Sequence, residues 1–272
     1  MNRRLQHILA IPYYLWIVLF VVTPILLLIY RSFFGIDGSL TFGNYIEYFS
    51  SPYYMQMTFA SFLSALLVTL ITFLFAYPMA YFLTKTKRKD LWLMLIILPT
   101  WINLLLKIYA FIGLLGQTGP VVALFQRLGL GSPQLLFTNA AFILVAAYVE
   151  LPFMMLPIFN SIDEIPTSII EASLDLGSSE WVTLRRVIFP LSMRGVTSGV
   201  QAVFIPSLSL FMLTRLIGGN RVITLGTAVE QHFLVTQNWG MGATIGVVLL
   251  LLMVIVMRFT RPKEIGGSTH DA

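Results

Sequence analysis

Charged side chains that could bind a partner or carry out a reaction are concentrated in one stretch of the chain. Residues 163–191 read DEIPTSIIEASLDLGSSEWVTLRRVIFPL and hold five acids and two arginines, whereas the whole chain of 272 residues is only 11% charged. Long apolar segments lie on both sides of this stretch. It is too polar to cross a bilayer. We interpret it as a docking element, through which a soluble partner drives the membrane part.

Helix signals within the stretch predict two short helices joined by a glycine. Ser168 and Glu171 have the spacing of a capping box, which predicts the start of the first helix. Gly177 suits the left-handed position that follows a helix end. A second helix is expected to run from there to about Ile188, where Pro190 stops it. Glu171 could serve only as a cap of its own helix, or it could also contact the partner.

The segments that flank the stretch are apolar enough to cross a membrane. The chain is 57% hydrophobic, which is more than a soluble domain usually contains. A span takes about 20 helical residues, and apolar segments of that order lie at 11–30, 57–83, 91–115, 139–159, 193–217 and 239–257. The first could be a cleaved signal peptide, but its length and the lack of a small-residue cleavage site favour an uncleaved helix.

Several kinds of chemistry are excluded by what the sequence lacks. There are no cysteines, which excludes disulfides, thiolate metal sites and cysteine nucleophiles. There is no G-x-x-x-x-G-K-[ST] loop for binding ATP. An intramembrane enzyme would need clustered polar side chains, yet no predicted span holds two acids, and His7, His232 and His270 lie outside the spans. A passive channel or scaffold, the other alternative, would not need a docking element with a glycine hinge.

The basic residues indicate how the chain is oriented in the membrane. With both termini inside, the inner segments hold 12 of the 17 lysines and arginines, and the outer loops hold three. This asymmetry follows the positive-inside rule and places the docking stretch in the cytoplasm. The same rule explains the cluster Lys85–Lys89 as a cytoplasmic anchor, without nucleic-acid binding. We divide the chain into a first helix with an external loop (1–56), a five-helix core (57–257) and a cytoplasmic tail (258–272).

The docking stretch resembles the cytoplasmic signature of permease subunits in binding-protein-dependent ABC importers, Glu-Ala-Ala-x3-Gly-x9-Ile-x-Leu-Pro. Four residues match at that spacing, namely Glu171, Ala172, Gly177 and Pro190. Ser173, Val187 and Phe189 replace Ala, Ile and Leu, which are mild changes in size and polarity. Further segments that look like the spermidine/putrescine permeases of the PotB type are Leu98–Asn103, Lys107–Tyr109, Leu151–Pro157 and Gly240–Thr244.

The resemblance implies an all-α polytopic membrane protein of the type I ABC importer permease fold, with six transmembrane helices and a cytoplasmic coupling helix between helices four and five. It implies a non-catalytic transport subunit in the cell (inner) membrane that binds no cofactor itself, with ATP and Mg²⁺ on a partner ATPase. The implied partners are a second permease of the PotC type, an ATPase dimer of the PotA type and an external polyamine-binding protein of the PotD type, lipid-anchored or periplasmic. The implied ATPase-coupling residues are Glu171, Ala172, Ser173, Asp175, Gly177 and Pro190.

Residues within the spans are candidates for contacting a polyamine. Glu150 lies near the middle of the fourth span, where a carboxylate is costly unless it faces a cavity or a partner. It could bind a polyamine ammonium, or it could only hold the helices together. Lys107 lies about 10 Å away in depth by helical rise, and is expected at the outer interface rather than beside Glu150. Trp101, Tyr109 and Tyr148 could add cation–π contacts or could only face lipid.

The cargo and two glycine pairs are left open by the sequence. Neither spermidine nor putrescine is favoured, and another small solute, such as a metal-ion complex or an inorganic anion, is the alternative. An anion site should recruit basic residues deep in the spans, where only Lys107 comes close. The pairs Gly195/Gly199 and Gly242/Gly246 permit close helix contact, either with the second permease or within the chain.

Overall fold

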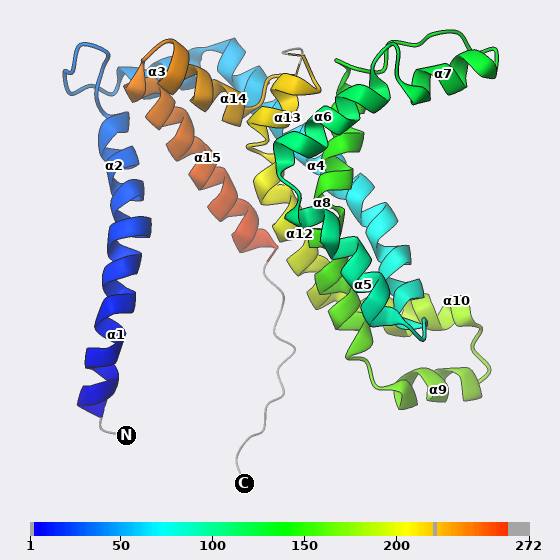
Figure 1. The fold of residues 1–272 in the computed structure, drawn as a ribbon. Coiled ribbons are helices and arrows are strands. Elements are labelled where there is room, and N and C mark those ends of the chain that lie inside the picture. The colour runs from blue at the N-terminus through cyan, green and yellow to red at the C-terminus, as the bar shows by residue number, and fades with distance from the viewer. Residues whose placement is uncertain (1–2, 220–221, 261–272) are drawn as a thin grey trace.

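Helices make up the architecture of this protein (Figure 1). The computed structural model describes residues 3–219 and 222–260, and within these ranges it has no β-strand beyond an isolated bridge between Phe34 and Leu40. Residues 261–272 of the predicted tail lie outside the described residues. In chain order the elements are α1 (Arg3–Ile17), η1 (Val18–Val22), α2 (Thr23–Ser32), α3 (Gly43–Ser50), α4 (Pro52–Thr84), α5 (Lys89–Ile97), η2 (Leu98–Trp101), α6 (Leu104–Leu115), α7 (Pro120–Arg127), α8 (Asn139–Asp163), α9 (Thr167–Asp175), α10 (Glu180–Thr183), η3 (Leu184–Ile188), α11 (Phe189–Leu191), α12 (Met193–Ser207), α13 (Phe211–Leu216), α14 (Leu225–Glu230), η4 (Gln231–Val235) and α15 (Trp239–Phe259).

The described helices include enough long apolar segments for a polytopic membrane protein. Five could cross a membrane, namely Ala10–Ser32, Pro52–Thr84, Leu104–Arg127, Asn139–Asp163 and Trp239–Phe259. The pair Glu180–Leu191 and Met193–Ser207, which is bent by 66°, makes a sixth if it counts as one span. The predicted fold class, an all-α polytopic membrane protein, is confirmed.

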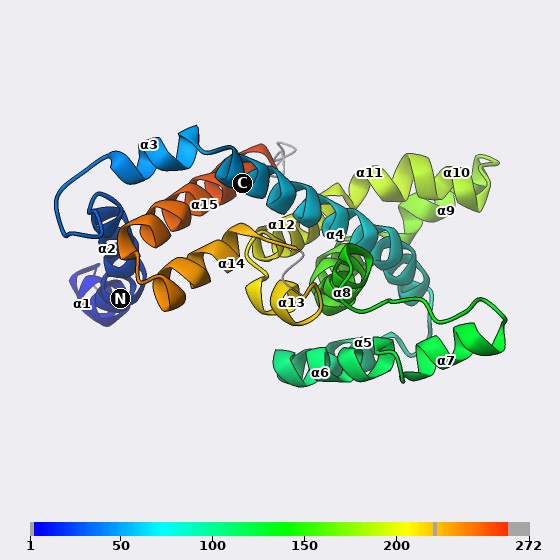
Figure 2. The same ribbon diagram turned by 90° about the horizontal axis from the view of Figure 1, so that it is seen from above.

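The core of the protein is a bundle of α4, α8 and α12, which lie side by side in both ribbon views (Figures 1 and 2). Its buried side chains include Val68, Ala76, Phe142, Met154, Met155, Ile158 and Val203. Two glycines bring α12 close to α8. A Cβ atom at Gly199 would lie 2.8 Å from Met154 Sδ, and one at Gly195 would overlap the Pro157 carbonyl oxygen. This glycine pair therefore serves packing within the chain.

The first and last membrane helices pack on each other. Thr244 Oγ1 of α15 donates a hydrogen bond of 3.1 Å to the carbonyl oxygen of Ser32, 212 positions earlier in the chain. A Cβ atom at Gly246 would lie 3.2 Å from the Leu28 side chain, so this glycine also serves contact within the chain. In contrast, none of the 18 residues that form the apolar part of Ala10–Ser32 is buried. Figure 1 accordingly shows α1 standing apart from the bundle.

The third predicted span, over 91–115, is not one helix. It is divided into α5, η2 and α6. Pro99 cannot donate a backbone hydrogen bond, and the Asn103 side chain accepts one of 2.8 Å from the Leu105 amide, which caps a new helix. The segment that is long and apolar enough to cross a membrane is Leu104–Arg127, which includes α7. The predicted bounds of the third span, 91–115, are therefore wrong.

Candidate functional site

The docking stretch forms α9 and α10 at one end of the molecule (Figure 1). The helix α9 already begins at Thr167, and the N-cap position is Pro166, where no side chain accepts a hydrogen bond. The predicted capping box of Ser168 and Glu171 is therefore wrong. With Pro166 at the N-cap, the Ser168 hydroxyl lies in the first turn, two positions too late to act as the cap.

The turn after α9 is built around Gly177, as predicted. Its φ of 84° is in the left-handed region, which glycine adopts without steric cost. The Gly177 amide donates a hydrogen bond of 2.8 Å to the Leu174 carbonyl, and the Ser178 amide donates one of 3.2 Å to the Ser173 carbonyl. These two bonds form a Schellman motif, which fixes the direction in which the chain leaves α9.

The second helix of the stretch starts as predicted but does not stop at Pro190. Ser179 caps α10 by accepting a 3.4 Å hydrogen bond from the Val182 amide. The chain then stays helical through η3 and α11, up to a bend of 66° that separates it from α12. The predicted stop is wrong because η3 is a π-helical turn, in which the Phe189 amide bonds to the carbonyl of Leu184, five residues earlier. The wider spacing of a π-helical turn accommodates Pro190, which directly follows Phe189.

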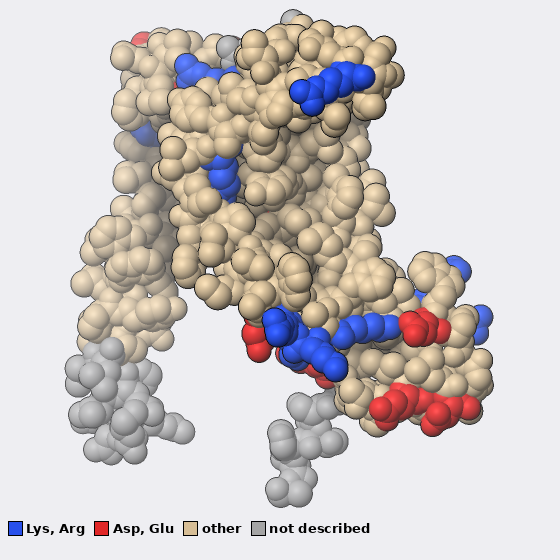
Figure 3. Space-filling view, turned by 45° about the vertical axis from the view of Figure 1, so that its right-hand side comes forward, with Lys and Arg blue, Asp and Glu red and all other residues tan. Residues whose placement is uncertain are grey.

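Most of the predicted coupling residues share one exposed element. Glu171, Ala172 and Asp175 lie exposed on α9, Gly177 is exposed in the turn, Ser173 is half-buried, and Pro190 is exposed on α11, beyond α10. Around them α9 also exposes apolar side chains, of which Leu176 is 87% exposed, whereas Ile170 packs against the core. Figure 3 shows acidic side chains along the edge where α9 lies and basic side chains above them. This surface, formed by residues 167–177, is called the α9 face below.

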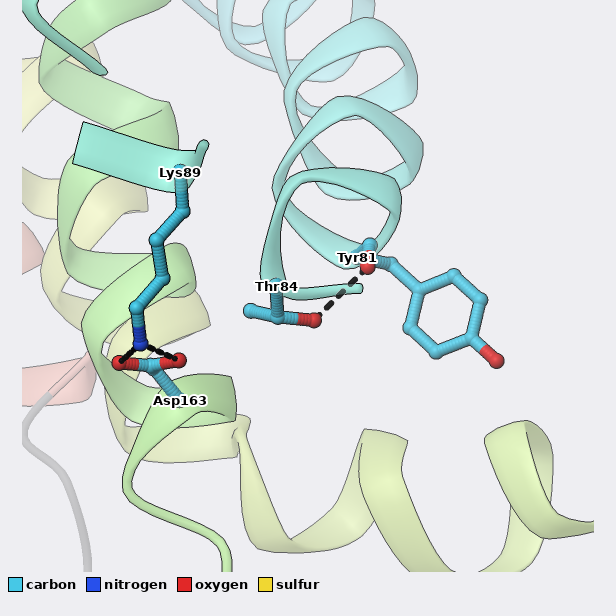
Figure 4. A network of polar contacts seen from close by, with 4 residues as sticks. All are labelled: Tyr81, Thr84, Lys89 and Asp163. Atoms are coloured by element: carbon cyan, nitrogen blue, oxygen red, sulfur yellow. Dashed lines mark hydrogen bonds and ion pairs between the residues drawn. The ribbon is translucent and has the colours of Figure 1, made fainter. Parts of the chain in front are cut away.

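The sequence reading missed two ion pairs that hold the docking stretch to the turn after α4. Lys85 Nζ lies 2.9 Å from Glu180 Oε2. Lys89 Nζ lies 2.8 and 2.7 Å from the two oxygens of Asp163, as Figure 4 shows. Lys85 Nζ also lies 4.6 Å from the centre of the Tyr81 ring. The Tyr81 side chain raises the pKa of Lys85 the most, and the Glu180 carboxylate raises it further. Both effects keep this ammonium charged. A signal was present, because the basic run faces a stretch rich in acids, but we had interpreted it only as an anchor.

The predicted residues of the substrate pathway are not brought together. Glu150 is buried, at 6% exposure, on the bundle helix α8, and no hydrogen bond or ion pair of its side chain is found among the described residues. Tyr148 lines a cavity of about 150 Å³ between α8, η2 and α6. Trp101 and Tyr109 are 80% and 59% exposed on the outer surface of the chain. Glu150 and Tyr148 are on the same helix, whereas Trp101 lies in η2 and Tyr109 in α6.

The expected position of Lys107 is wrong. It is half-buried and lines the same cavity as Tyr148, Val149 and Leu151, the residues around Glu150. The helical-rise calculation failed because the chain breaks before Asn103, which changes the path of the third span. Lys107 therefore lies next to the part of α8 that carries Glu150. The two side chains form no ion pair within 4.0 Å among the residues described.

Metal chemistry has no candidate in the part of the chain that the structure describes. Within residues 3–219 and 222–260, no group of three or more His, Cys, Asp or Glu side chains could hold a metal ion. The prediction that this chain itself binds no cofactor stays a prediction.

Comparisons with known proteins agree with this architecture. No protein-family model matches the chain. The Spermidine/putrescine transport system permease protein PotB of Haemophilus influenzae is 33% identical over 266 residues, which cover 94% of this chain and 93% of that protein. PotB of Escherichia coli is 33% identical over 252 residues, which cover 89% of this chain and 91% of that protein. The inner membrane ABC transporter permease protein YdcU of Escherichia coli is 27% identical over 260 residues, covering 87% and 82%.

Solved structures show the same fold at low identity. A chain of a bacterial alginate ABC transporter in complex with a pentasaccharide-bound periplasmic protein has a TM-score of 0.81 at 14% identity, covering 94% of this chain and 92% of that chain. Another structure of an ABC transporter involved in alginate import gives a TM-score of 0.73 at 15% identity, covering 96% of both chains. With the sequence identity to full-length permeases, these findings assign the family: the chain belongs to the PotB family of ABC transporter permeases.

Proposed function

We propose that this chain is a membrane subunit of an ATP-driven importer of polyamines, spermidine or putrescine, and forms half of the translocation pathway. The observation that carries the proposal is the 33% identity, over 94% of the chain, to a permease named for these two substrates. The chain acts as a transport subunit and not as an enzyme. Its apolar helices support a multi-pass position in the inner membrane, and the bias of basic residues supports cytoplasmic termini.

The proposed complex contains a second permease of the PotC type, an ATPase dimer of the PotA type that binds ATP and Mg²⁺, and an external polyamine-binding protein of the PotD type. Support comes from the architecture of the relatives, since a structural neighbour is an ABC transporter in complex with a periplasmic protein. This chain contributes no ATP-binding loop. Energy must therefore reach its spans through a docking surface.

We assign that docking surface to the α9 face. Three apolar side chains of this face are exposed to solvent, namely Ile169 (43%), Leu174 (40%) and Leu176 (87%). An exposed apolar patch of this kind is typical of an interaction site. Glu171 and Asp175 add charge beside them. This combination suits a groove on a soluble protein, with apolar contacts for affinity and acids that set the register. The Schellman turn keeps the helix in a fixed direction, so that a push on α9 displaces its attached spans.

Glu150 is the residue we propose for contacting the cargo within the membrane. A buried carboxylate without an observed partner among the described residues favours binding to a cation. Polyamines carry ammonium groups, which such a carboxylate would bind by charge-assisted hydrogen bonds. Tyr148, on the same helix and at the edge of the neighbouring cavity, supplies an aromatic face for a second ammonium.

The test is uptake of labelled spermidine by proteoliposomes that hold both permeases and the ATPase, with the binding protein outside. Unlabelled spermidine and putrescine should compete, whereas a metal-ion complex or an inorganic anion should not. Glu150→Gln should lower uptake by about ten-fold, as expected when a charged hydrogen bond of roughly 1.5 kcal/mol is lost. The matched control is Glu164→Gln, an exposed acid beyond the end of α8.

Competition by a metal-ion complex or by an anion, but not by polyamines, would reject the substrate while leaving the importer assignment intact. If wild-type proteoliposomes take up no substrate in response to ATP and loaded binding protein, the importer assignment itself is wrong. Equal uptake by Glu150→Gln and the wild type would restrict Glu150 to a packing role.

A further inference from the structure

Residues 164–179 of the docking stretch are held on both sides by ion pairs to one short basic turn. Asp163 is the last residue of α8 and Glu180 is the first residue of α10, so these two acids enclose residues 164–179 in the sequence. Lys89 binds Asp163, with two contacts of 2.8 and 2.7 Å, and Lys85 binds Glu180 at 2.9 Å. The two lysines are only four positions apart.

The same turn connects two other membrane elements. Lys85 directly follows α4, and Lys89 is the first residue of α5. Figure 4 shows Lys89 reaching across to Asp163, with the end of α4 beside them at Tyr81 and Thr84. Each ion pair therefore links the docking stretch to a different membrane element, Lys85 to the end of α4 and Lys89 to the start of α5.

Behind α9 the packing is incomplete, which leaves room for this helix to move. A cavity of about 310 Å³ separates α9 from the ends of α4 and α8. Its lining includes Lys85, Asp163 and Glu180, together with Ile170 and Leu174 of α9. The ion pairs therefore lie at the edges of this cavity. Across the cavity, α9 makes few direct apolar contacts with the bundle.

We propose that Lys85 and Lys89 are positioning residues that clamp the docking stretch to α4 and α5, so that movement of α9 is transmitted to these spans as well as to α8 and α12. The proposal rests on the importer function proposed above and names the residues that carry its mechanical step. A push on α9 alone would otherwise be absorbed by the cavity behind it. With both acids held, the push displaces the turn 85–89 and the two helices that it joins.

These pairs are suited to positioning rather than to stability. The side chains of Lys85 and Glu180 are 48% and 76% exposed, and those of Lys89 and Asp163 are 40% and 33% exposed. Exposed pairs of this kind add little to folding stability. Removing them should therefore leave an assembled complex in which the transmission of movement is changed, and this outcome separates the clamp from a purely structural role.

The first experiment measures the ratio of spermidine taken up to ATP hydrolysed, in proteoliposomes of the full complex with loaded binding protein. The double variant Lys85→Gln/Lys89→Gln should assemble and hydrolyse ATP, but with an uptake ratio lowered by about five-fold, the lower end of typical coupling between sites. Lys87→Gln is the matched control, since Lys87 lies exposed in the same turn and makes no ion pair within the described residues. Exchanging the two charges in Lys89→Asp/Asp163→Lys should bring the ratio of spermidine taken up to ATP hydrolysed closer to the wild-type value than Lys89→Asp or Asp163→Lys alone does.

The second experiment does not depend on transport. The chain has no cysteine, so Leu74→Cys on α4 and Ser168→Cys can carry the only pair of spin labels in this chain. Ser168 is exposed on α9 and is not among the proposed docking side chains. In the assembled complex, the distance distribution between the labels should broaden in Lys85→Gln/Lys89→Gln and stay unchanged in Lys87→Gln.

An equal loss in Lys87→Gln, an unchanged uptake ratio, or an unchanged label distance in the double variant would each overturn the clamp. Failure of the wild-type complex to import spermidine would instead overturn the proposed function. The spin-label result would still report whether the two lysines hold α9 in place.

Discussion

Ser173 Oγ lies 3.0 Å from Thr183 Oγ1, and this contact joins α9 to α10 across the turn at Gly177. Thr183 is only 2% exposed, so its hydroxyl depends on a protein partner. Ser173→Ala and Thr183→Val should each lower the free energy of unfolding by roughly 1 kcal/mol, and the double variant by little more than one of them. Thermal unfolding of the purified protein in detergent measures this cycle.

The matched control for that cycle is Ser168→Ala. Ser168 lies exposed on the same helix, at the position where the capping box was predicted and is absent. Its removal should leave the melting temperature unchanged. A loss of roughly 1 kcal/mol, typical of a deleted cap, would contradict the observed start of α9 at Thr167.

Replacing Gly177 should impair transport more than assembly. At φ 84° an alanine costs roughly 1–2 kcal/mol, and a proline cannot adopt this φ at all. We expect Gly177→Ala to lower the ATP-dependent uptake of spermidine and Gly177→Pro to abolish it, with both permeases still co-purifying with the ATPase. Gly131→Ala is the control, because Gly131 has φ 78° but lies in the loop before α8. Unchanged uptake by Gly177→Pro would remove the hinge role of this turn.

The contact between α12 and α8 should not tolerate a methyl group. A Cβ atom at Gly195 would lie 2.5 Å from Ser161 Cβ, and the neighbouring Pro157 carbonyl is backbone that cannot rotate away. Gly195→Ala should destabilise the protein by about 1–3 kcal/mol, as overpacking usually does. Gly113→Ala is the control, since no atom lies within 4 Å of the added Cβ in α6. A melting temperature of Gly195→Ala equal to that of Gly113→Ala would show that α12 packs elsewhere.

Acid should weaken the packing around His232, which lies in η4. Burial lowers the pKa of this side chain from 6.5, and the Glu47 carboxylate opposes the shift in part. Its Nε2 lies 3.1 Å from Tyr54 Oη. Because the unfolded state then binds more protons, stability is complete above pH 6.5 and is lost as the pH falls through the folded pKa. The melting temperature should drop between about pH 7.5 and about pH 5.5, and this drop should be smaller in His232→Gln. Identical pH dependence in both proteins would assign the effect to other groups.

The sequence predicted those features that depend on local chemistry. Hydrophobic runs near the length of a span identified the membrane helices, since a bilayer leaves few other ways to satisfy the backbone. The left-handed position of Gly177 was predictable because glycine adopts this backbone conformation without steric cost.

What was not predicted includes two local departures from regular helix and several contacts between residues that are distant in sequence. A π-helical turn continues the helix where a stop at Pro190 was predicted. A new helix cap at Asn103 lies inside the segment that was predicted as the third span. Lys107 was misplaced because a single helical rise was applied across a broken segment. The pairing of Lys85 with Glu180 joins residues 95 positions apart. Charge alone marked both residues as cytoplasmic, but only the packing of α4 against α8 and α12 determines which lysine meets which acid.

The hydrogen bond from Thr244 to Ser32 also sets a schedule for how this chain can be built. At synthesis rates of about 5–20 residues per second, the 212 positions between them take on the order of 10–40 s to translate. During that interval the first span is already in the bilayer, while the helix that later holds its end has not left the ribosome. The bundle of α4, α8 and α12 can assemble first, and the N-terminal span can pack against α15 only after α15 has been made.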